Sequence, residues 1–411
     1  MKTIIILGGG IGGIVAANEL RRKLCLDCKI ILIEKNPMHS FAPSFIWLMT
    51  GTRQTSEIQI QLSKLLLPGI DLVISEVNRI DVTNKKIISG NKEMPFDYLI
   101  IALGAELNLE AIPGLTSETN TFFTRDGSLK IYEDLKNFKG GSIAVVVCSL
   151  PYKCPGAPHE GSLLISDFFR KKGMKDKVVI NFYTPESQPM PVAGPVLGSA
   201  VEDLLRSKNI IFNPLYKLKS VDNENRMLFF ENKESVKYDL LIVIPPHRSP
   251  EVLKESALTN ESGWIPVDLN TLETKYENVF AIGDVTSISI PGRWKKDIPM
   301  NLPKAGVFAH GQAEIVSQII SERIEGINSG SQFEGFGYCM IEAGNGESGF
   351  AYGNFYGEPN PEIHLSNVSR RWHLGKVLFE KYWLAPIGVK KSFYEMLLKI
   401  SSKLLRIPIN I

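Results

Sequence analysis

The residues best suited to chemistry lie in one short stretch, Cys148 to Glu160, which reads CSLPYKCPGAPHE. Its two thiols and its closing carboxylate suit redox and proton-transfer chemistry. The stretch follows an apolar, strand-like run, Ser142 to Val147, and precedes a helical pattern that begins near Gly161. A glycine fingerprint at such a junction would cradle the pyrophosphate of NAD(P)H, but here prolines and cysteines replace the glycines. We therefore predict cysteine redox chemistry in place of nicotinamide binding.

A dinucleotide fingerprint does stand at the start of the chain. The run Thr3 to Leu7 is typical of a buried parallel strand, and G-x-G-x-x-G follows at Gly8, Gly10 and Gly13 before a helical pattern. Such glycines permit a tight turn, a close approach to a pyrophosphate and close packing of helix on strand. Glu34 ends the next apolar run, where a carboxylate accepts hydrogen bonds from a ribose.

Two later runs complete a pattern that favours FAD over NAD. Asp97 to Ala105 (DYLIIALGA) and Asn278 to Val285 (NVFAIGDV) are apolar strands that end in glycine turns. A carboxylate at the carboxyl end of a parallel strand faces the ligand crevice, so we expect Asp284, after Gly283, to accept a ribityl hydroxyl. The apolar stretch Phe41 to Gly51 has no cysteine, so covalent attachment there is excluded and we predict non-covalent FAD.

A long amphipathic pattern, Val307 to Ile324, follows the sequence NLPKAG. The amino terminus of such a helix would stabilise a reduced flavin through its dipole and free N–H groups; an ordinary surface helix is the alternative. The further candidates for contact with the cofactor are Lys35, Pro43, Ala102, Gly104, Lys304, Ala305 and Gly306.

Composition narrows the class of protein. The chain has 411 residues, 44% hydrophobic and 22% charged, with a formal net charge of +2, which argues against binding of nucleic acid through bulk charge. Its five cysteines make no disulfide framework, and Cys25 and Cys28 lack the second Cys/His pair of a metal site. The chain opens with a strand, a loop and a helix rather than a signal peptide, and no run of about 18 apolar residues occurs. We expect an intracellular soluble or peripheral protein without a metal.

The fold class predicted is α/β, with one Rossmann-like domain inserted into another. The second domain would contain a strand at Ser142 to Val147, a helix at Leu163 to Lys171 and a strand at Val178 to Tyr183, and Asp239 to Ile244 would return to the first domain. The expected divisions are the first part of the FAD-binding domain (1–108), the inserted domain (109–240), the second part of the FAD-binding domain (241–330) and a C-terminal region (331–411).

The C-terminal region holds one more cysteine and an amphipathic tail. Cys339 lies in Gly337 to Phe350, whose glycines favour tight turns near a ligand over a strand interior. It is the only distant cysteine in this half that could pair with Cys154. After Pro386 an apolar face and a basic face alternate, which suits a membrane interface; a helix packed on the protein or on a partner subunit is the alternative. The apolar face comprises Phe393, Met396, Leu397, Ile400, Leu404 and Ile407, and the basic face Lys390, Lys391, Lys399, Lys403 and Arg406.

Together these motifs resemble, in order and over essentially the whole chain, the sulfide:quinone oxidoreductase and flavocytochrome c sulfide dehydrogenase group. The most specific segments are the CPGAP-x-E loop, the later Cys-x-Ile-Glu and the near-terminal KVLFEKYWL. The resemblance implies that Cys154 and Cys339 are a redox-active pair beside the flavin and that Glu160 is the acidic residue that follows. Two departures are the lack of a third cysteine in Thr121 to Leu135, with Cys148 displaced, and His159 where an aromatic residue is usual.

The resemblance also implies a function: oxidation of sulfide through the Cys154–Cys339 disulfide and FAD, with electrons passed to membrane quinone. Attack by hydrosulfide would leave a persulfide and a thiolate, whose pKa we expect positive dipoles to lower, while burial would raise the pKa of Glu160 so that it can move protons. A quinone pocket could include Phe350, Tyr352 and Phe379. We expect a peripheral protein on the cytoplasmic side of the cell membrane, and homo-oligomerisation stays open.

Three alternatives remain at this point. The first is a type II NADH:quinone oxidoreductase, which would need a glycine fingerprint after Val147. The second is a flavoprotein subunit that delivers electrons to a cytochrome partner. The third is a non-catalytic interaction protein stabilised by FAD.

Overall fold

The first of two parallel sheets carries the glycine fingerprint. The computed structural model describes residues 2–231, 233–327 and 330–405. The sheet has the order β20-β9-β1-β2-β5 and is parallel throughout. Its strands are β1 (Thr3–Leu7), β2 (Lys29–Glu34), β5 (Ile70–Ile74), β9 (Tyr98–Ile101) and β20 (Val279–Ala281). Both faces are covered at β1, β9 and β20, which is why these strands are apolar at nearly every position, whereas the edge strand β5 is partly exposed.

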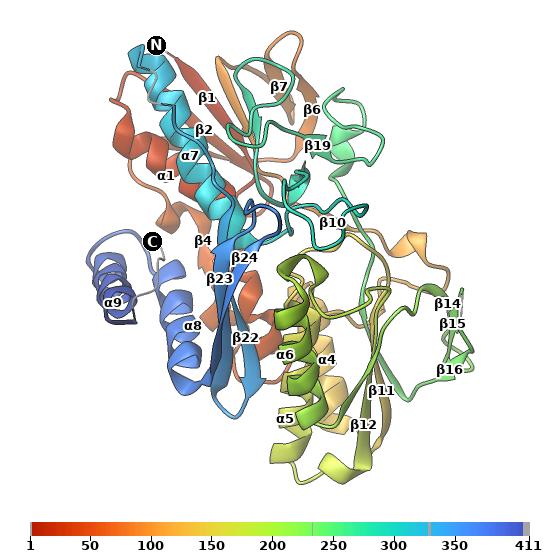
Figure 1. Cartoon of the computed structure of the whole chain (residues 1–411). Coiled ribbons are helices and arrows are strands. Elements are labelled where there is room, and N and C mark those ends of the chain that lie inside the picture. The colour runs from red at the N-terminus through yellow and green to blue at the C-terminus, as the bar shows by residue number, and fades with distance from the viewer. Residues whose placement is uncertain (1, 232, 328–329, 406–411) are drawn as a thin grey trace.

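Alternate residues of the central strand point into two different cores. Ile4 and Ile6 pack against α1 (Ile11–Lys23) and α7 (Gly306–Glu325), which lie side by side on one face (Figure 1). Ile5 and Leu7 pack on the other face, against the antiparallel strands β6 (Val77–Asp81), β7 (Lys86–Ser89) and β8 (Lys92–Pro95). The period of two thus distributes one strand between two layers.

The second sheet has the order β13-β12-β11-β17 and is also parallel. Its strands are β11 (Gly141–Val147), β12 (Val178–Tyr183), β13 (Ile210–Asn213) and β17 (Leu240–Ile244). Helices α4 (Arg125–Asn137), α5 (Ala157–Lys171) and α6 (Pro195–Ser207) and the antiparallel strands β14 (Leu218–Asp222), β15 (Met227–Phe230) and β16 (Val236–Lys237) complete this lobe. Because β20 returns to the first sheet after this lobe, one α/β unit is inserted in the other, as predicted.

Two expectations about the second lobe are wrong. The run Asp239 to Ile244 does not return to the first sheet. It forms β17, which pairs with β11 at the edge of the second sheet and is apolar and buried at every position. Helix α5 begins at Ala157, not near Gly161, with Pro158 in its first turn, where the missing N–H costs nothing. Glu160 therefore belongs to the helix rather than to the loop.

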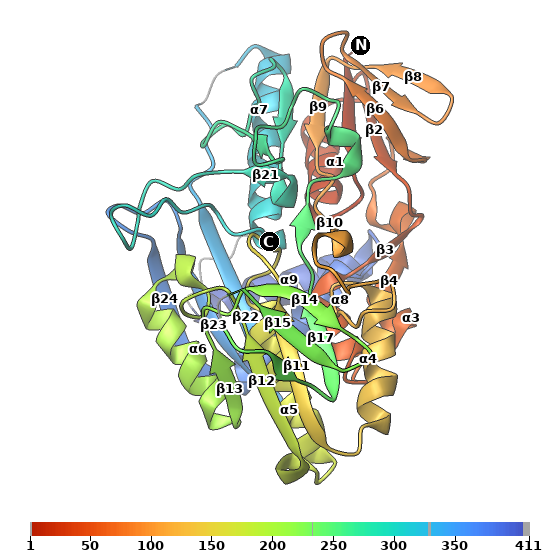
Figure 2. The same cartoon turned by 90° about the vertical axis from the view of Figure 1, so that its right-hand side faces the viewer.

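The lobes meet at a pair of short strands. β10 (Glu106–Leu107) pairs antiparallel with β18 (His247–Arg248) where the chain leaves and re-enters the first domain (Figure 2). The other short pairs are β3 (Met38–Ser40) with β4 (Gln59–Gln61) and β19 (Ile265–Pro266) with β21 (Thr286–Ser287). Single turns of helix are α2 (Phe45–Leu48), α3 (Thr55–Ile58), η1 (Ala42–Ser44), η2 (Leu62–Leu65), η3 (Leu109–Ala111), η4 (Lys175–Lys177), η5 (Pro191–Ala193), η6 (Glu251–Leu253) and η7 (Gly283–Val285).

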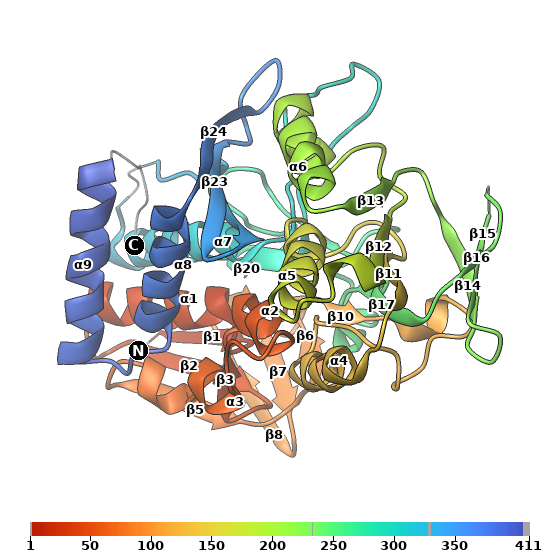
Figure 3. The same cartoon turned by 90° about the horizontal axis from the view of Figure 1, so that it is seen from below.

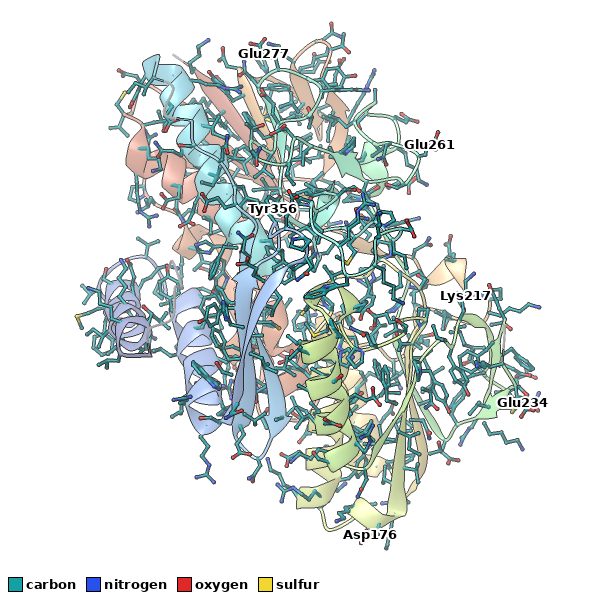
Figure 4. All side chains as sticks on the ribbon, viewed as in Figure 1. Asp176, Lys217, Glu234, Glu261, Glu277 and Tyr356 are labelled. Atoms are coloured by element: carbon teal, nitrogen blue, oxygen red, sulfur yellow. The ribbon has the colours of Figure 1, made fainter. Side chains whose placement is uncertain are left out.

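The C-terminal region is an antiparallel sheet followed by two helices. Strands β22 (Phe336–Gly344), β23 (Glu347–Asn354) and β24 (Glu362–Ser369) form the sheet, and α8 (Arg370–Trp383) and α9 (Val389–Leu405) follow. Tyr356, labelled near the middle of Figure 4, donates its hydroxyl to the Leu269 carbonyl at 3.0 Å and so ties this sheet to the first domain. The expectation that Cys339 lies in a turn is wrong, because it is inside β22; the turn comes later, at Asn345 and Gly346.

The terminal helix α9 lies at the margin of the molecule, with α8 between it and the sheet (Figure 3). Phe393, Met396, Ile400 and Leu404 of the predicted apolar face are exposed, as is Val389, whereas Leu398 is buried. Lys391, predicted for the basic face, instead packs on α8, with its ammonium 4.6 Å from the Tyr382 ring centroid. Arg406 and Ile407 lie outside the described residues. In the described part of the chain, no helix is long and apolar enough to cross a bilayer.

Candidate active site

The loop between β11 and α5 holds Cys154 in a fixed and unusual backbone conformation. Cys154 has φ of +54°, the left-handed region that residues other than glycine seldom adopt. Hydrogen bonds on both sides stabilise it: its N–H donates to the Lys304 carbonyl at 2.6 Å, and its carbonyl accepts from Ala157 at 2.9 Å. Lys153 also pairs with Lys304 in a β-bridge. The loop is thereby joined to the residues that precede α7.

The fold brings Cys154 and Cys339 to one cavity. Both are half-buried free thiols, and both line a cavity of about 700 Å³ between the lobes. Cys339 packs against the loop two residues after Cys154, since a Cβ on Gly156 would lie 3.2 Å from the Cys339 Sγ. The cavity wall is mainly apolar, with Met190, Trp264, Trp294, Ile298, Tyr338 and Phe355 among its residues. Cys148 is buried in a separate apolar cluster and does not line the cavity.

The thiols are not activated in the way the sequence led us to expect. Burial, reinforced by the charge of Glu160, raises the pKa of Cys154 to about 12, although Lys376 acts in the opposite direction. Burial also raises the pKa of Cys339. The expectation of a lowered thiol pKa is therefore wrong, because desolvation of the thiolate outweighs the nearby positive charge.

Glu160 lies beside these thiols in a buried ion pair. Its carboxylate accepts hydrogen bonds from the ammonium of Lys376 and from the Glu342 N–H, the latter at 2.9 Å. Burial raises the pKa of Glu160 even though Lys376 opposes the change, which is the expected direction. For Lys376, burial lowers the pKa, but the charges of Glu160 and Glu342 outweigh burial and raise it. Lys376 was not among the predicted site residues, although KVLFEKYWL contains it.

A second buried carboxylate extends this network. Glu342, in the Cys-x-Ile-Glu segment, contacts the His373 Nδ1 at 2.9 Å and accepts from Ser348 at 2.6 Å. Burial alone would raise the pKa of Glu342, but these hydrogen bonds and the charge of Lys376 lower it. His373 and Lys376 stand three residues apart on α8, so both reach the same side of that helix. That spacing is the signal in the sequence that could have revealed the pair.

The glycine fingerprint has the shape that a pyrophosphate requires. A Cβ on Gly13 would collide with the Gly8 carbonyl, which explains the close contact of α1 with β1. A Cβ on Gly10 would meet nothing within 4 Å, and no side chain caps the helix there. Glu34 accepts from the Gly9 N–H at 2.6 Å, at the end of β2. The neighbouring Lys35 is exposed.

The residues around Asp284 also fit a ribityl chain. The Asp284 Oδ1 is buried and has no hydrogen-bond partner in the described part of the chain, which is costly unless a ligand donates to it. Gly283 has φ of +73° and donates its N–H to Gln312 at 2.7 Å. The Lys304 ammonium donates to the Asp284 and Thr286 carbonyls at 2.7 and 2.8 Å. Burial lowers the pKa of Lys304 to about 8.

The remaining candidates lie in three places. Ala102 and Gly104 follow β9, where a Cβ on Gly104 would meet open space. Pro43 lies in η1. Ala305 and Gly306 open α7, whose first turn has no side-chain cap. The free N–H groups of this helix and of α1, with the open Gly10 and the unpaired Asp284 oxygen, fit FAD.

The proposed quinone aromatics do not share one cavity wall. Phe350 is buried, and its ring is stacked on that of Trp372 with the ring centroids 4.6 Å apart. The ring centroids of Phe379 and Phe41 lie 6.0 Å apart. Tyr352 is the one of the three predicted residues that lines the large cavity. The ring of Tyr338 lies between those of Phe350 and Phe379, with centroid distances of 6.3 and 6.4 Å.

Comparison with known proteins agrees with this geometry. The chain is 26% identical to a sulfide-quinone reductase of Aquifex aeolicus (strain VF5) over 98% of this chain and 95% of that protein. It is 24% identical to the mitochondrial sulfide:quinone oxidoreductase of Mus musculus, over 95% of this chain and 89% of that one. The crystal structure of the Aquifex aeolicus sulfide:quinone oxidoreductase superposes with a TM-score of 0.84, at 26% identity, over 97% and 95% of the two chains.

These findings confirm the resemblance to the sulfide:quinone oxidoreductase group. A family model described as pyridine nucleotide-disulphide oxidoreductase matches residues 2–307. That match spans both sheets, the cysteine loop and the start of α7. The chain therefore belongs to the pyridine nucleotide-disulphide oxidoreductase family.

Proposed function

We propose that this protein oxidises sulfide with non-covalently bound FAD and passes the electrons to a membrane quinone. The observation that carries the proposal is the convergence of Cys154 and Cys339 on one apolar cavity. The wall of that cavity also includes Lys304 and Ala305, which precede α7. The similarity to sulfide:quinone oxidoreductases over nearly the whole chain supports the same function.

The flavin would be held by the two helix termini and the two carboxylates already described. Gly8, Gly10 and Gly13 would surround the pyrophosphate, Glu34 would accept from a ribose, and Asp284 would accept from the ribityl chain. When bound, FAD would take two electrons from each hydrosulfide, which loses its proton and becomes zero-valent sulfur, and would then pass these electrons on to quinone.

The cysteines supply the sulfur chemistry. In their oxidised form, hydrosulfide would attack the Cys154–Cys339 bond, so that one S–S bond breaks and another forms between the incoming sulfur and one cysteine. The leaving cysteine departs as a thiolate. Because burial raises the pKa of both thiols, that thiolate takes up a proton, and the acidic persulfide beside it releases one. Glu160, which pairs with Lys376, would move this proton.

Attachment to the membrane would use α9. Its exposed apolar residues Phe393, Met396, Ile400 and Leu404 could enter the lipid interface, while Lys399 and Lys403 meet anionic headgroups. A peripheral position on the cytoplasmic face of the cell membrane would let a quinone approach the aromatic cluster around Tyr338 and Phe379.

An anaerobic titration tests the function directly. The purified protein is mixed with sulfide, and separately with NADH, while the flavin absorbance is followed. Bleaching by sulfide, with reoxidation by a soluble quinone analogue, is the expected result. Bleaching by NADH alone would contradict the proposal and favour an NADH:quinone oxidoreductase. Reoxidation by cytochrome c, and not by quinone, would instead identify a cytochrome-linked flavoprotein.

A further inference from the structure

A histidine connects the glycine fingerprint to the far end of the chain. His39, in β3, is buried between Gly9 of the fingerprint and Trp383, the last residue of α8. The Trp383 Nε1 lies 2.9 Å from the His39 Nε2, and the His39 Nδ1 lies 3.1 Å from the Gly9 carbonyl oxygen. Both ring nitrogens therefore have a partner, and neither contact belongs to the cysteine site.

The indole decides which nitrogen of His39 carries the proton. An indole N–H can only donate, so the His39 Nε2 must accept from Trp383. The ring is then protonated at Nδ1, which donates to the Gly9 carbonyl. Burial lowers the pKa of His39, which agrees with a neutral ring. A doubly protonated ring would place two N–H groups against each other at Trp383.

This hydrogen bond fixes the orientation of the Gly9–Gly10 peptide. The Gly9–Gly10 peptide is trans, so the Gly9 carbonyl and the Gly10 N–H point in opposite directions. Because His39 holds the carbonyl on one side, the Gly10 N–H faces the other. Gly10 is exposed, and the space beside it is open. The preceding peptide is held as well, since the Gly9 N–H donates to Glu34.

We propose that Trp383 is a positioning residue for FAD: it selects the His39 tautomer, and His39 then orients the Gly10 N–H toward the pyrophosphate. The inference rests on the proposed function, because it requires FAD at this fingerprint. It assigns α8 a role in cofactor retention that is separate from that of Lys376 on the same helix, which pairs with Glu160 of α5.

The test measures FAD dissociation from holoprotein by the rise of flavin fluorescence after dilution. Trp383→Phe should raise the Kd of FAD about tenfold, which corresponds to about 1.4 kcal/mol. Trp372→Phe is the matched control: it lies on the same helix, is also buried, and its indole donates to Asn367 at 3.1 Å instead. The control should leave the Kd unchanged.

Variants of His39 test the same Trp383–His39 hydrogen bond by changing its acceptor. His39→Phe should raise the Kd as much as Trp383→Phe, and the double variant should show no further loss. His39→Gln should retain most of the affinity, because an amide can accept from Trp383 and donate to Gly9 at once. If Trp383→Phe or His39→Phe folds and keeps the wild-type Kd, the inference is wrong while the proposed function stands. If the wild-type protein binds no FAD, both fail.

Discussion

Glu160 and Lys376 stand 216 residues apart in the sequence and form a buried ion pair next to the two cysteines. The pair joins the first turn of α5 to α8, and the Glu342 N–H and the Met340 carbonyl complete its hydrogen bonds. Burying two charges is favourable only when each keeps its partner. This relationship makes the acid beside Cys154 dependent on a lysine of the C-terminal region.

Removing the lysine should therefore destabilise the fold. Lys376→Met leaves Glu160 buried without its cation, and we expect the free energy of unfolding to fall by about 3–5 kcal/mol, measured by denaturant titration. Lys399→Met removes the lysine of an exposed ion pair on α9 and should change the free energy of unfolding by less than about 1 kcal/mol. The double variant Glu160→Gln/Lys376→Met should recover part of the loss. Equal effects of the two lysine variants would show that the buried pair contributes no more to stability than an exposed pair.

The two cysteines should be needed for sulfide oxidation but not for the flavin. Cys154→Ser and Cys339→Ser should each retain FAD and lose anaerobic bleaching by sulfide, because neither variant can form the disulfide that we propose as the target of hydrosulfide. Cys148→Ser, buried outside the cavity, is the control and should bleach normally. Normal bleaching in either of the first two variants would rule out the disulfide mechanism.

A buried carboxyl in the cavity wall should make stability depend on pH. Glu186 accepts from Tyr152 at 3.0 Å and from Thr184 at 3.1 Å, yet burial raises its pKa from 4.5 to about 7. Between these values the folded state keeps a proton that the unfolded state has released, so stability falls as the pH rises through this window.

Glu186→Gln keeps the acceptor but cannot ionise. The free energy of unfolding of this variant, relative to wild type, should therefore increase by about 3 kcal/mol as the pH rises from about 4.5 to above about 7. The measurement is chemical denaturation across that range. Glu277→Gln, the same substitution at an exposed glutamate labelled in Figure 4, is the control with which the change is compared. A constant difference for Glu186→Gln would mean that this group does not titrate as proposed.

The exposed face of α9 should determine binding to lipid. Truncation before Lys390, or the double variant Ile400→Asp/Leu404→Asp, should abolish sedimentation with anionic vesicles, because burial of these exposed apolar side chains in the lipid interface would supply most of the proposed binding energy. Leu365→Asp, at an exposed leucine of β24, should still sediment. Unchanged vesicle binding after truncation would place the membrane contact elsewhere.

Local patterns were enough to predict the framework of both sheets. The bounds of β1 and β12 agree with the apolar runs Thr3 to Leu7 and Val178 to Tyr183. For β1 the reason is that a strand covered on both faces must be apolar at consecutive positions. The glycine spacing after β1 likewise predicts the tight turn from strand to helix, whereas His39, which contacts the Gly9 carbonyl, is supplied by a later part of the chain. The insertion of one α/β unit in the other was predicted as well, but the strand that returns to the first sheet is β20 and not the run Asp239 to Ile244.

The tertiary structure decided what surrounds the cysteines. That Cys339 lies inside β22, that β17 completes the second sheet, and that Lys376 reaches Glu160 all depend on contacts between residues far apart in the sequence. The same holds for the tautomer of His39, which a tryptophan 344 positions later determines. The amino-acid sequence by itself determined which residues could hold a nucleotide and handle sulfur. Only the packing of the C-terminal region against both lobes decided how these groups are charged, because burial and partner charges exist only in the folded chain.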